Sequence, residues 1–290
     1  MAVFELKVEI PLGAVPAVEE LLAAHEEQHL MILEDKPSGR AWLTGYYESS
    51  AEAVTGWKRF VAEVDPEWLA TAPGLIELAD KDWKESYKEH FKAWQFGRLH
   101  WVPVWERAIF KLPAGEQVLW LDPGMAFGTG NHETTRLVVE RLVKIAEQRG
   151  VQGRVIDAGC GSGILALSAV TLGFARVVAF DNDPLAVAVS RENAELNGLE
   201  GRVDFSVGDL VTGLTGREAE LVLANIQADV LIKFAPQLLA AVAPGGVLVL
   251  SGILASELAQ VSRAFAELAP VWASDSRVLG EWSDLVLAPP

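Results

Sequence analysis

The chain has 290 residues, of which 50% are hydrophobic and 22% are charged, so it can bury a full hydrophobic core and is not a disordered protein. Its single cysteine excludes an internal disulfide and a four-thiolate zinc site, and it fits a reducing, cytoplasmic compartment. The net charge of −16 disfavours direct binding of nucleic acid and suits a basic partner, although solubility alone also explains an acidic surface. The chain has neither a signal peptide nor an apolar run of about 18 residues, so we expect no secretion and no membrane span.

The charge is unevenly spread and divides the chain into three blocks. Residues 1–79 carry 5 basic and 14 acidic side chains, and residues 112–290 carry 12 basic and 21 acidic ones. Residues 80–111 between them are mildly basic and hold 8 of the 24 aromatic residues. This pattern predicts two domains, at 1–79 and 112–290, joined by a linker with a role of its own.

The first block has the pattern of a small α/β domain. Apolar residues that alternate or cluster predict four strands, at about 4–10, 30–33, 41–47 and 75–78. Two helices are expected, at about 15–27 and 49–64. The second of these helices has a capping-box spacing between Ser49 and Glu52. The order strand–helix–strand–strand–helix–strand is that of a ferredoxin-like domain.

The linker begins with the pattern of an amphipathic helix. Four aromatic residues stand three or four positions apart, on one helix face: Trp83, Tyr87, Phe91 and Trp94. Three lysines form a second stripe beside them: Lys84, Lys88 and Lys92. Packing on a domain is the simplest use of such a helix, and a surface that guides a partner is the alternative. Gly97 ends the helical pattern, and extended chain is expected after it.

Strands and helices alternate in the third block, as they do in a doubly wound parallel sheet. Short apolar strands are expected at 154–157, 176–180, 205–207, 221–224 and 246–250. Four polar side chains stand at or near the carboxyl ends of these strands: Asp157, Asp181, Asp209 and Asn225. Ligands of open α/β sheets bind at that edge, so we expect the site there. For Asp157, capping of the next helix is the alternative.

A glycine-rich loop, Gly159-x-Gly161-x-Gly163, joins the first of these strands to a helix. Glycine lets the backbone turn tightly and approach a ligand closely. Asp181 ends the next strand, where its carboxylate can accept hydrogen bonds from ribose hydroxyls. The loop lacks the third glycine of the dehydrogenase pattern, and an acidic edge repels pyrophosphate. A nucleoside ligand without pyrophosphate is therefore favoured, and S-adenosylmethionine fits that description.

With these motifs the chain closely resembles the bacterial ribosomal protein L11 methyltransferases, over nearly its whole length. The most specific segments are 122–130 (DPGMAFGTG), 132–135 (HETT), 157–165, 181–184, 193–194, 197–198, 224–226 and 251–254, with 82–83 and 97–99 in the linker. The resemblance implies a class I, Rossmann-like methyltransferase domain preceded by a small ferredoxin-like domain. It also implies that four residues bind S-adenosylmethionine: Thr135, Gly159, Asp181 and Asn225.

The resemblance further implies what the protein modifies. Methyl groups would pass to lysine side chains, to the N-terminal α-amine, or to both, on the basic large-subunit protein at the base of the ribosomal stalk. Residues 1–79 would recognise that substrate, and the linker would let them move. We expect a cytoplasmic monomer. The alternatives are a methyltransferase for another protein, an RNA or a small molecule, and a nucleotide-binding module without transfer activity; the acidic blocks disfavour RNA.

Other residues complete the predicted site. Gly161, Gly163 and Asp209 join the cofactor-binding set, and Phe127 can either face the sulfonium or pack in the core. Asn225 is the predicted catalytic residue, because its side-chain carbonyl can accept a hydrogen bond from the reacting amine.

No metal site is expected. His132-Glu133 begins like a zinc-protease motif, but Arg136 stands where the second histidine is required. His25 and His29 have a metal-ligand spacing on a predicted helix, and no third ligand is near them.

Overall fold

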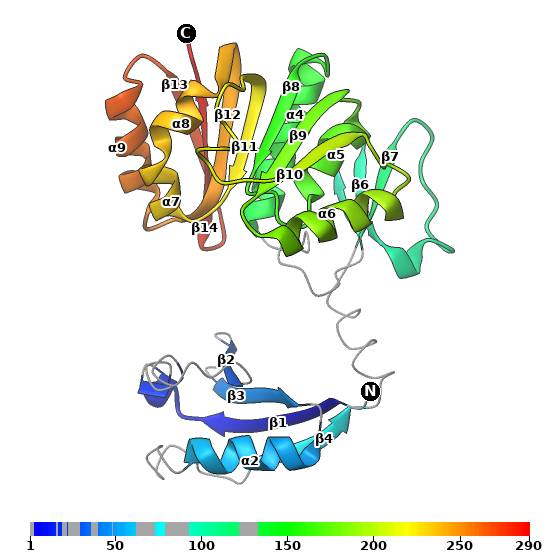
Figure 1. Cartoon of the computed structure of the whole chain (residues 1–290), viewed down its shortest axis with the longest axis vertical. Coiled ribbons are helices and arrows are strands. Elements are labelled where there is room, and N and C mark those ends of the chain that lie inside the picture. Colours follow the sequence, from blue (N-terminus) through cyan, green and yellow to red (C-terminus); the bar gives the residue numbers. More distant parts are fainter. Residues whose placement is uncertain are drawn as a thin grey trace. The chain divides into compact units, whose positions relative to one another are not determined.

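The computed structural model describes residues 3–15, 17–18, 22, 30–35, 40–47, 49–61, 73–78, 93–121 and 133–290. The chain divides into two compact units, Met1–Phe91 and Lys92–Pro290, and Figure 1 shows the elements of each. Each unit has a hydrophobic core of its own.

The smaller unit is a four-stranded antiparallel sheet with the order β2-β3-β1-β4. Its strands are β1 (Val3–Ile10), β2 (Leu30–Asp35), β3 (Arg40–Tyr47) and β4 (Gly74–Leu78). Alternate residues of β1, namely Leu6, Val8 and Ile10, are buried, because a strand turns every second side chain to the same face. The strand order is that of the predicted ferredoxin-like fold.

Helical chain packs on the buried face of this sheet. Helix α2 (Ser50–Val61) contributes Ala53 and Phe60 to the core. The Glu52 N–H donates to the Ser49 hydroxyl at 3.2 Å, which confirms the predicted cap. A short 3₁₀ turn, η1 (Leu12–Ala14), follows β1, and the described residues of the first predicted helix are helical.

The larger unit is built on a seven-stranded sheet with the order β10-β9-β8-β11-β12-β14-β13. Its strands are β8 (Arg154–Ala158), β9 (Arg176–Asp181), β10 (Val203–Val207), β11 (Ala219–Asn225), β12 (Val242–Leu254), β13 (Ala273–Leu279) and β14 (Trp282–Ala288). The five strands from β10 to β12 are parallel, and β14 runs antiparallel to both of its neighbours. The β13–β14 hairpin lies beyond the predicted strands, because the polar, mostly exposed residues of β13 give no apolar pattern.

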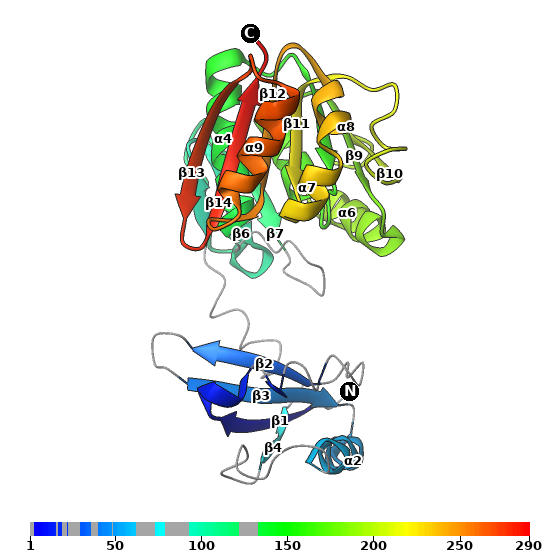
Figure 2. The same cartoon turned by 90° about the vertical axis from the view of Figure 1, so that its left-hand side faces the viewer.

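Helices cover both faces of this sheet, as Figures 1 and 2 show. One face packs on α4 (Glu133–Arg149), α5 (Ile164–Leu172) and α6 (Pro184–Leu196), and the other on α7 (Ala228–Lys233), α8 (Ala235–Ala240) and α9 (Leu258–Leu268). Neighbouring strand residues enter different cores: Val155 faces the first set of helices and Ile156 the second. The result is the doubly wound α/β class that the sequence predicts.

Residues 93–121 form a three-stranded sheet in the larger unit, with β5 (Trp94–Phe96), β6 (Leu99–Pro103), the 3₁₀ turn η4 (Val104–Glu106) and β7 (Gln117–Leu121). Leu99 and Trp101 are completely buried, and the Trp101 indole donates to Ser168 Oγ at 2.9 Å. Trp94 therefore begins a strand, and its prediction as the last residue of a helical stripe is wrong. The apolar run of β6, buried along its whole length, favours a strand here. The rest of that stripe lies in 79–92, outside the described residues.

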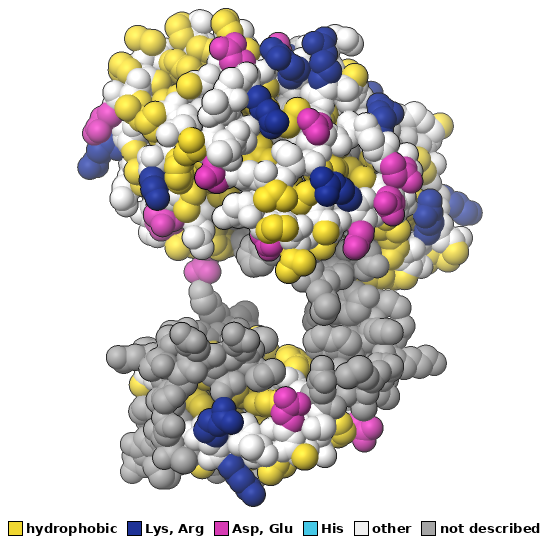
Figure 3. All heavy atoms as spheres, viewed as in Figure 1, with side chains coloured by type: hydrophobic (Ala, Val, Ile, Leu, Met, Phe, Trp, Pro, Cys, Tyr) yellow, Lys and Arg dark blue, Asp and Glu magenta, His cyan; other side chains and the backbone are white. Residues whose placement is uncertain are grey.

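Two surface properties bear on partners. Among the described residues, no helix is both long and apolar enough to cross a bilayer. On the face of the larger unit drawn in Figure 3, acidic and basic side chains are interspersed rather than gathered by sign. Charge on that face therefore marks no single docking area.

Candidate cofactor and active site

The loop between β8 and α5 is shaped by three glycines. Gly159, Gly161 and Gly163 have φ values of +73°, +53° and +77°. Residues with a side chain rarely adopt such values. A Cβ atom on Gly159 would lie 2.6 Å from Ile226 Cγ2, and one on Gly163 would lie 2.9 Å from Ser190 Cβ. The loop thus lies too close to its neighbours for any larger residue at these two positions.

Asp181 links the end of β9 to this loop. Its Oδ2 accepts a hydrogen bond from the Gly161 N–H at 2.9 Å, and its Oδ1 accepts one from the Asp183 N–H at 3.0 Å. Two predicted cofactor-binding residues, Gly161 and Asp181, are therefore in direct contact. Each carboxylate oxygen has capacity for a further donor, such as a ribose hydroxyl.

Asp157 is buried beneath the loop and supports α5. Its Oδ2 accepts the Ala166 N–H at 2.9 Å, whereas Oδ1 has no hydrogen-bond partner among the described residues. Burial raises the pKa of this carboxyl from 3.8 to about 7; the Ala166 hydrogen bond opposes the rise, and the charge of Asp181 adds to it. The structure therefore shows the alternative role considered for Asp157, which is to cap the helix that follows the loop.

Thr135 and Asn225 come together from distant parts of the sequence. Thr135 lies in the first turn of α4 and is buried, and Asn225 ends β11. Asn225 Nδ2 donates to Thr135 Oγ1 at 3.4 Å, a long hydrogen bond. Because this contact uses Nδ2, the Oδ1 atom of the same amide is left to accept a hydrogen bond from another donor.

A cavity of about 300 Å³ opens at the carboxyl ends of β8, β9, β10 and β11. Of the predicted residues, Gly159 and Asp209 line it. Its other lining residues, which were not among the predicted site residues, are Phe180, Asn182, Gly208, Leu210, Ile226, Val230 and Phe234. Phe180 and Ile226 stand next to predicted site residues and could have been found by that position. Val230 and Phe234, on and just after α7, carry no local signal.

Asp209 builds the turn at the rim of this cavity. Its Oδ1 accepts hydrogen bonds from the Val211 N–H and from the Thr212 N–H and hydroxyl, at 2.7–2.9 Å. These donors, above all the Thr212 N–H, lower the pKa of the Asp209 carboxyl. One carboxylate oxygen is thus used within the loop, and a contact of Asp209 with a cofactor stays a prediction.

Cys160 and Phe127 differ in how far the structure describes them. Cys160 is buried inside the glycine loop, and burial raises the pKa of its thiol to about 12, which agrees with a packing role. Phe127 lies outside the described residues with the rest of 122–132.

Within the described part of the chain, no three His, Cys, Asp or Glu side chains are grouped as for a metal ion. His25, His29 and His132 lie outside that part.

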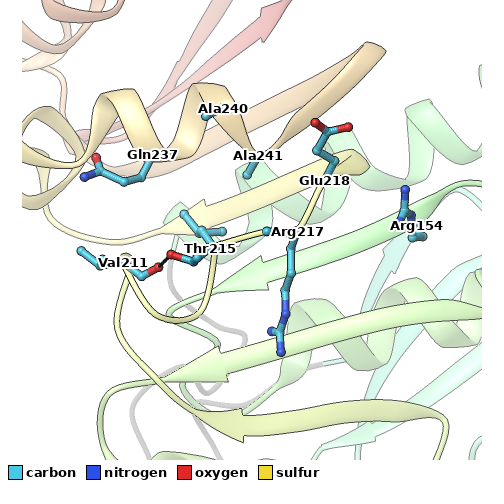
Figure 4. Close-up of a pocket in the computed structure, with 10 residues that line it drawn as sticks. Arg154, Val211, Thr215, Arg217, Glu218, Gln237, Ala240 and Ala241 are labelled. Carbon is cyan, nitrogen blue, oxygen red and sulfur yellow. Dashed lines mark hydrogen bonds between the residues drawn. The ribbon is translucent and has the colours of Figure 1, made fainter.

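A second cavity, of about 470 Å³, lies at the opposite edge of the sheet and contains none of the predicted residues. Figure 4 shows Arg154 at the start of β8, Arg217 and Glu218 before β11, and Gln237 on α8 around it. The dashed line there joins the Thr215 hydroxyl to the Val211 carbonyl, at 2.6 Å. The glycine loop and the strand carboxyl ends single out the smaller cavity as the candidate site.

The strand order, the reversed strand β14 and the contact between the glycine loop and Asp181 define a Rossmann-like methyltransferase domain. A solved structure titled ribosomal protein L11 methylase, from Lactobacillus delbrueckii subsp. bulgaricus, is similar to the chain with a TM-score of 0.61 and 30% identity; the match covers 69% of this chain and 99% of that one.

Sequence comparison identifies the family. The family model described as ribosomal protein L11 methyltransferase (PrmA) matches residues 10–288. A relative of that name from Geobacter metallireducens is 42% identical over 239 residues, which cover 81% of this chain and 76% of the relative. Another from Pseudomonas aeruginosa is 46% identical over 193 residues, covering 66% and 62%. The chain belongs to the ribosomal protein L11 methyltransferase family, which confirms the resemblance.

Proposed function

We propose that this protein transfers methyl groups from S-adenosylmethionine to amino groups of ribosomal protein L11, at lysine side chains, the N-terminal α-amine, or both. The observation that carries the proposal is the glycine loop bonded to Asp181 beside an apolar cavity, in a chain whose family match spans residues 10–288. The substrate is the basic protein at the base of the ribosomal stalk, and the enzyme acts on it as a cytoplasmic monomer without binding nucleic acid directly.

The residues present fit this cofactor. The apolar cavity walls suit a heterocyclic base, and Asp181 suits the ribose hydroxyls. The unpartnered Oδ1 of Asp157 is a buried acceptor that a donor from a bound ligand would satisfy. The carboxylate of Asp181 also favours a ligand with positive charge over one with phosphates. When bound, S-adenosylmethionine supplies an electrophilic methyl group on a sulfonium.

For methyl transfer, the substrate's amine must reach the methyl group in its neutral form. At pH 7 a lysine with a pKa of about 10.4 loses its proton at a cost of about 4–5 kcal/mol, whereas an α-amine costs about 1 kcal/mol. Asn225 Oδ1 accepts one N–H of the incoming amine and so directs its lone pair, while Nδ2 stays on Thr135. No covalent enzyme intermediate is required, so catalysis comes mainly from proximity and orientation.

Three further roles belong to this proposal. Residues 1–79 recognise the ribosomal protein, and their 14 acidic side chains against 5 basic ones attract a basic surface. Phe127 faces the sulfonium, where an aromatic ring stabilises a cation. Ile226 and Gln227 follow Asn225 in place of a rigid Pro-Pro-aromatic run, which leaves room for an aliphatic amine.

The test is a labelling experiment. The full chain is incubated with methyl-labelled S-adenosylmethionine and a mixture of large-subunit ribosomal proteins, and the labelled species are identified by mass spectrometry. Label is expected on amines of L11. With the Asn225→Ala variant, the amount of label transferred to L11 should fall strongly. Label on a different protein would overturn the substrate assignment, and label on none would overturn the reaction.

A further inference from the structure

Helix α6 and its C-terminal cap residue carry a stripe of three polar side chains to which the cofactor site assigns no role. Ser190, Asn193 and Asn197 are spaced three and four positions apart, so they share one face of the helix. Ser190 is completely buried, and the two asparagines are half-buried. All three bond to backbone groups of elements outside α6. These side chains therefore connect α6 to other elements and do not simply face solvent.

The first part of the stripe holds the glycine loop. Ser190 Oγ donates to the Gly161 carbonyl at 2.7 Å, and Asn193 Nδ2 donates to the Ser162 carbonyl at 2.9 Å. On its other side the loop is held by Asp181, which accepts the Gly161 N–H. The loop is therefore fixed between the ribose-binding acid and α6.

The second part of the stripe holds strand β7. Asn197 Oδ1 accepts the Trp120 N–H at 2.7 Å, and Nδ2 donates to the Trp120 carbonyl at 3.0 Å and to the Asn193 carbonyl at 2.8 Å. β7 is an edge strand of the sheet β5-β6-β7, and the carboxamide reproduces the donor and acceptor of a neighbouring strand. Aspartate lacks the donors, and alanine lacks both functions.

These bonds form a continuous chain from Ser162 through Asn193 and Asn197 to Trp120. Trp120 stands two residues before Asp122, where the DPGMAFGTG segment begins in the sequence. The end of β7 and the glycine loop are thus fixed to one helix, which itself begins just after Asp181. This chain of hydrogen bonds connects the glycine loop to β7 through α6, without passing through the main sheet.

We propose that Asn193 and Asn197 are positioning residues that couple the glycine loop to strand β7 and thereby set the affinity for S-adenosylmethionine. The inference rests on the proposed function, because it takes S-adenosylmethionine as the ligand of this loop. Neither asparagine needs to touch the cofactor: Asn193 acts through the Ser162 carbonyl, and Asn197 acts through Asn193 and Trp120.

The test measures S-adenosylmethionine binding to the full chain by calorimetry, well below the melting temperature of every variant. Asn193→Asp and Asn197→Asp keep the side-chain size and remove the donors, and Asn193→Ala and Asn197→Ala remove the whole amide. Each variant is expected to raise the Kd about 5- to 20-fold, the range for one or two lost hydrogen bonds. Glu195→Ala, on the exposed face of α6, is the matched control and should leave the Kd unchanged.

Hydrogen exchange of 117–121 supplies a second readout that packing alone would not move. S-adenosylmethionine should slow exchange at the Trp120 amide in the unmodified protein and in Glu195→Ala, and should fail to do so in Asn197→Ala. Variants with a lower melting temperature but an unchanged Kd and an unchanged exchange response would overturn the proposal. If the unmodified protein does not bind S-adenosylmethionine, the proposed function fails instead, so the two failures are distinct.

Discussion

The buried carboxyl of Asp157 makes stability depend on pH in the direction opposite to that of an ion-paired acid. Burial raises its pKa from 3.8 to about 7. The folded protein therefore holds this proton more tightly than the unfolded chain, and binds more protons between about pH 4 and pH 7. Linkage then requires that the contribution of Asp157 to the free energy of unfolding falls as the pH rises through this window.

The Asp157→Asn variant removes the titration and keeps the local geometry. An asparagine carbonyl can still accept the Ala166 N–H, which Asp157 Oδ2 accepts at 2.9 Å, but the side chain cannot ionise. A rise of roughly three pKa units corresponds to about 4 kcal/mol between the two protonation states. Relative to the unmodified protein, the variant should therefore gain on the order of 2–4 kcal/mol of unfolding free energy between pH 4 and pH 8.

Urea unfolding of the cofactor-free full chain, followed by circular dichroism from pH 4.5 to pH 8, measures this difference. The smaller unit is identical in both proteins, so its transition cancels in the comparison. Asp204→Asn, at an exposed position on β10, is the matched control and should follow the unmodified protein at every pH. Parallel stability curves for the unmodified protein and Asp157→Asn would refute the reasoning, because Asp157 would then ionise as easily folded as unfolded.

Four further predictions concern the cofactor, the substrate and the core. Asp181→Ala should weaken S-adenosylmethionine binding at least tenfold, since hydrogen bonds to a charged acceptor are worth about 1.5–3 kcal/mol, with Asp204→Ala as the unaffected control; an unchanged Kd in calorimetry contradicts the ribose assignment. Residues 92–290 alone should bind S-adenosylmethionine but methylate L11 far more slowly than the full chain, and equal rates would show that the smaller unit is not needed for recognition. The KM for L11 should rise with salt, because the Debye length shrinks from about 10 Å at 0.1 M to about 3 Å at 1 M, while the Kd for S-adenosylmethionine changes little; a flat KM would leave the acidic charge as a solubility feature. Asp284→Ala should lower the free energy of unfolding by about 3–5 kcal/mol in chemical denaturation, because it removes the buried carboxylate that pairs with both Arg141 and Arg277 and leaves Arg141 only its exposed partner Asp275; a loss below about 1 kcal/mol would show that these pairs are not desolvated.

Elements with strong local signals could be predicted from the sequence. The alternation in β1 gave the right strand and the right buried face, since one face of that sheet is covered. Helix α5 follows the glycine loop, as predicted, and Gly163 and Gly173, both with positive φ, stand at its two ends. The sequence also places the glycine loop beside Asp181, because the carboxyl ends of parallel strands meet at one edge of a sheet.

Features that depend on distant parts of the chain could not be predicted. Trp94 fits a helical stripe in sequence, yet pairing with β6 makes it part of a strand, and its ring lies 3.8 Å from the Arg136 guanidinium carbon. Strand β13 has no apolar alternation, because none of its side chains is fully buried and most are exposed. The cavity residues on α7 are brought to the site by packing, which no local pattern records.

The β13–β14 hairpin has a consequence for how a buried charge is accommodated near the edge of the sheet. Among the described strands β13 pairs with β14 alone, and β14 lies between β13 and β12, so the hairpin is attached to the rest of the sheet through β14. Its buried carboxylate, Asp284, already accepts the Arg277 N–H and guanidinium from within the same hairpin. The charge is therefore paired within the hairpin itself, and Arg141 on α4 adds a second guanidinium to the same carboxylate. Donors from two different elements thus offset the cost of removing this carboxylate from water, and the attachment of the hairpin to α4 depends on a buried ion pair.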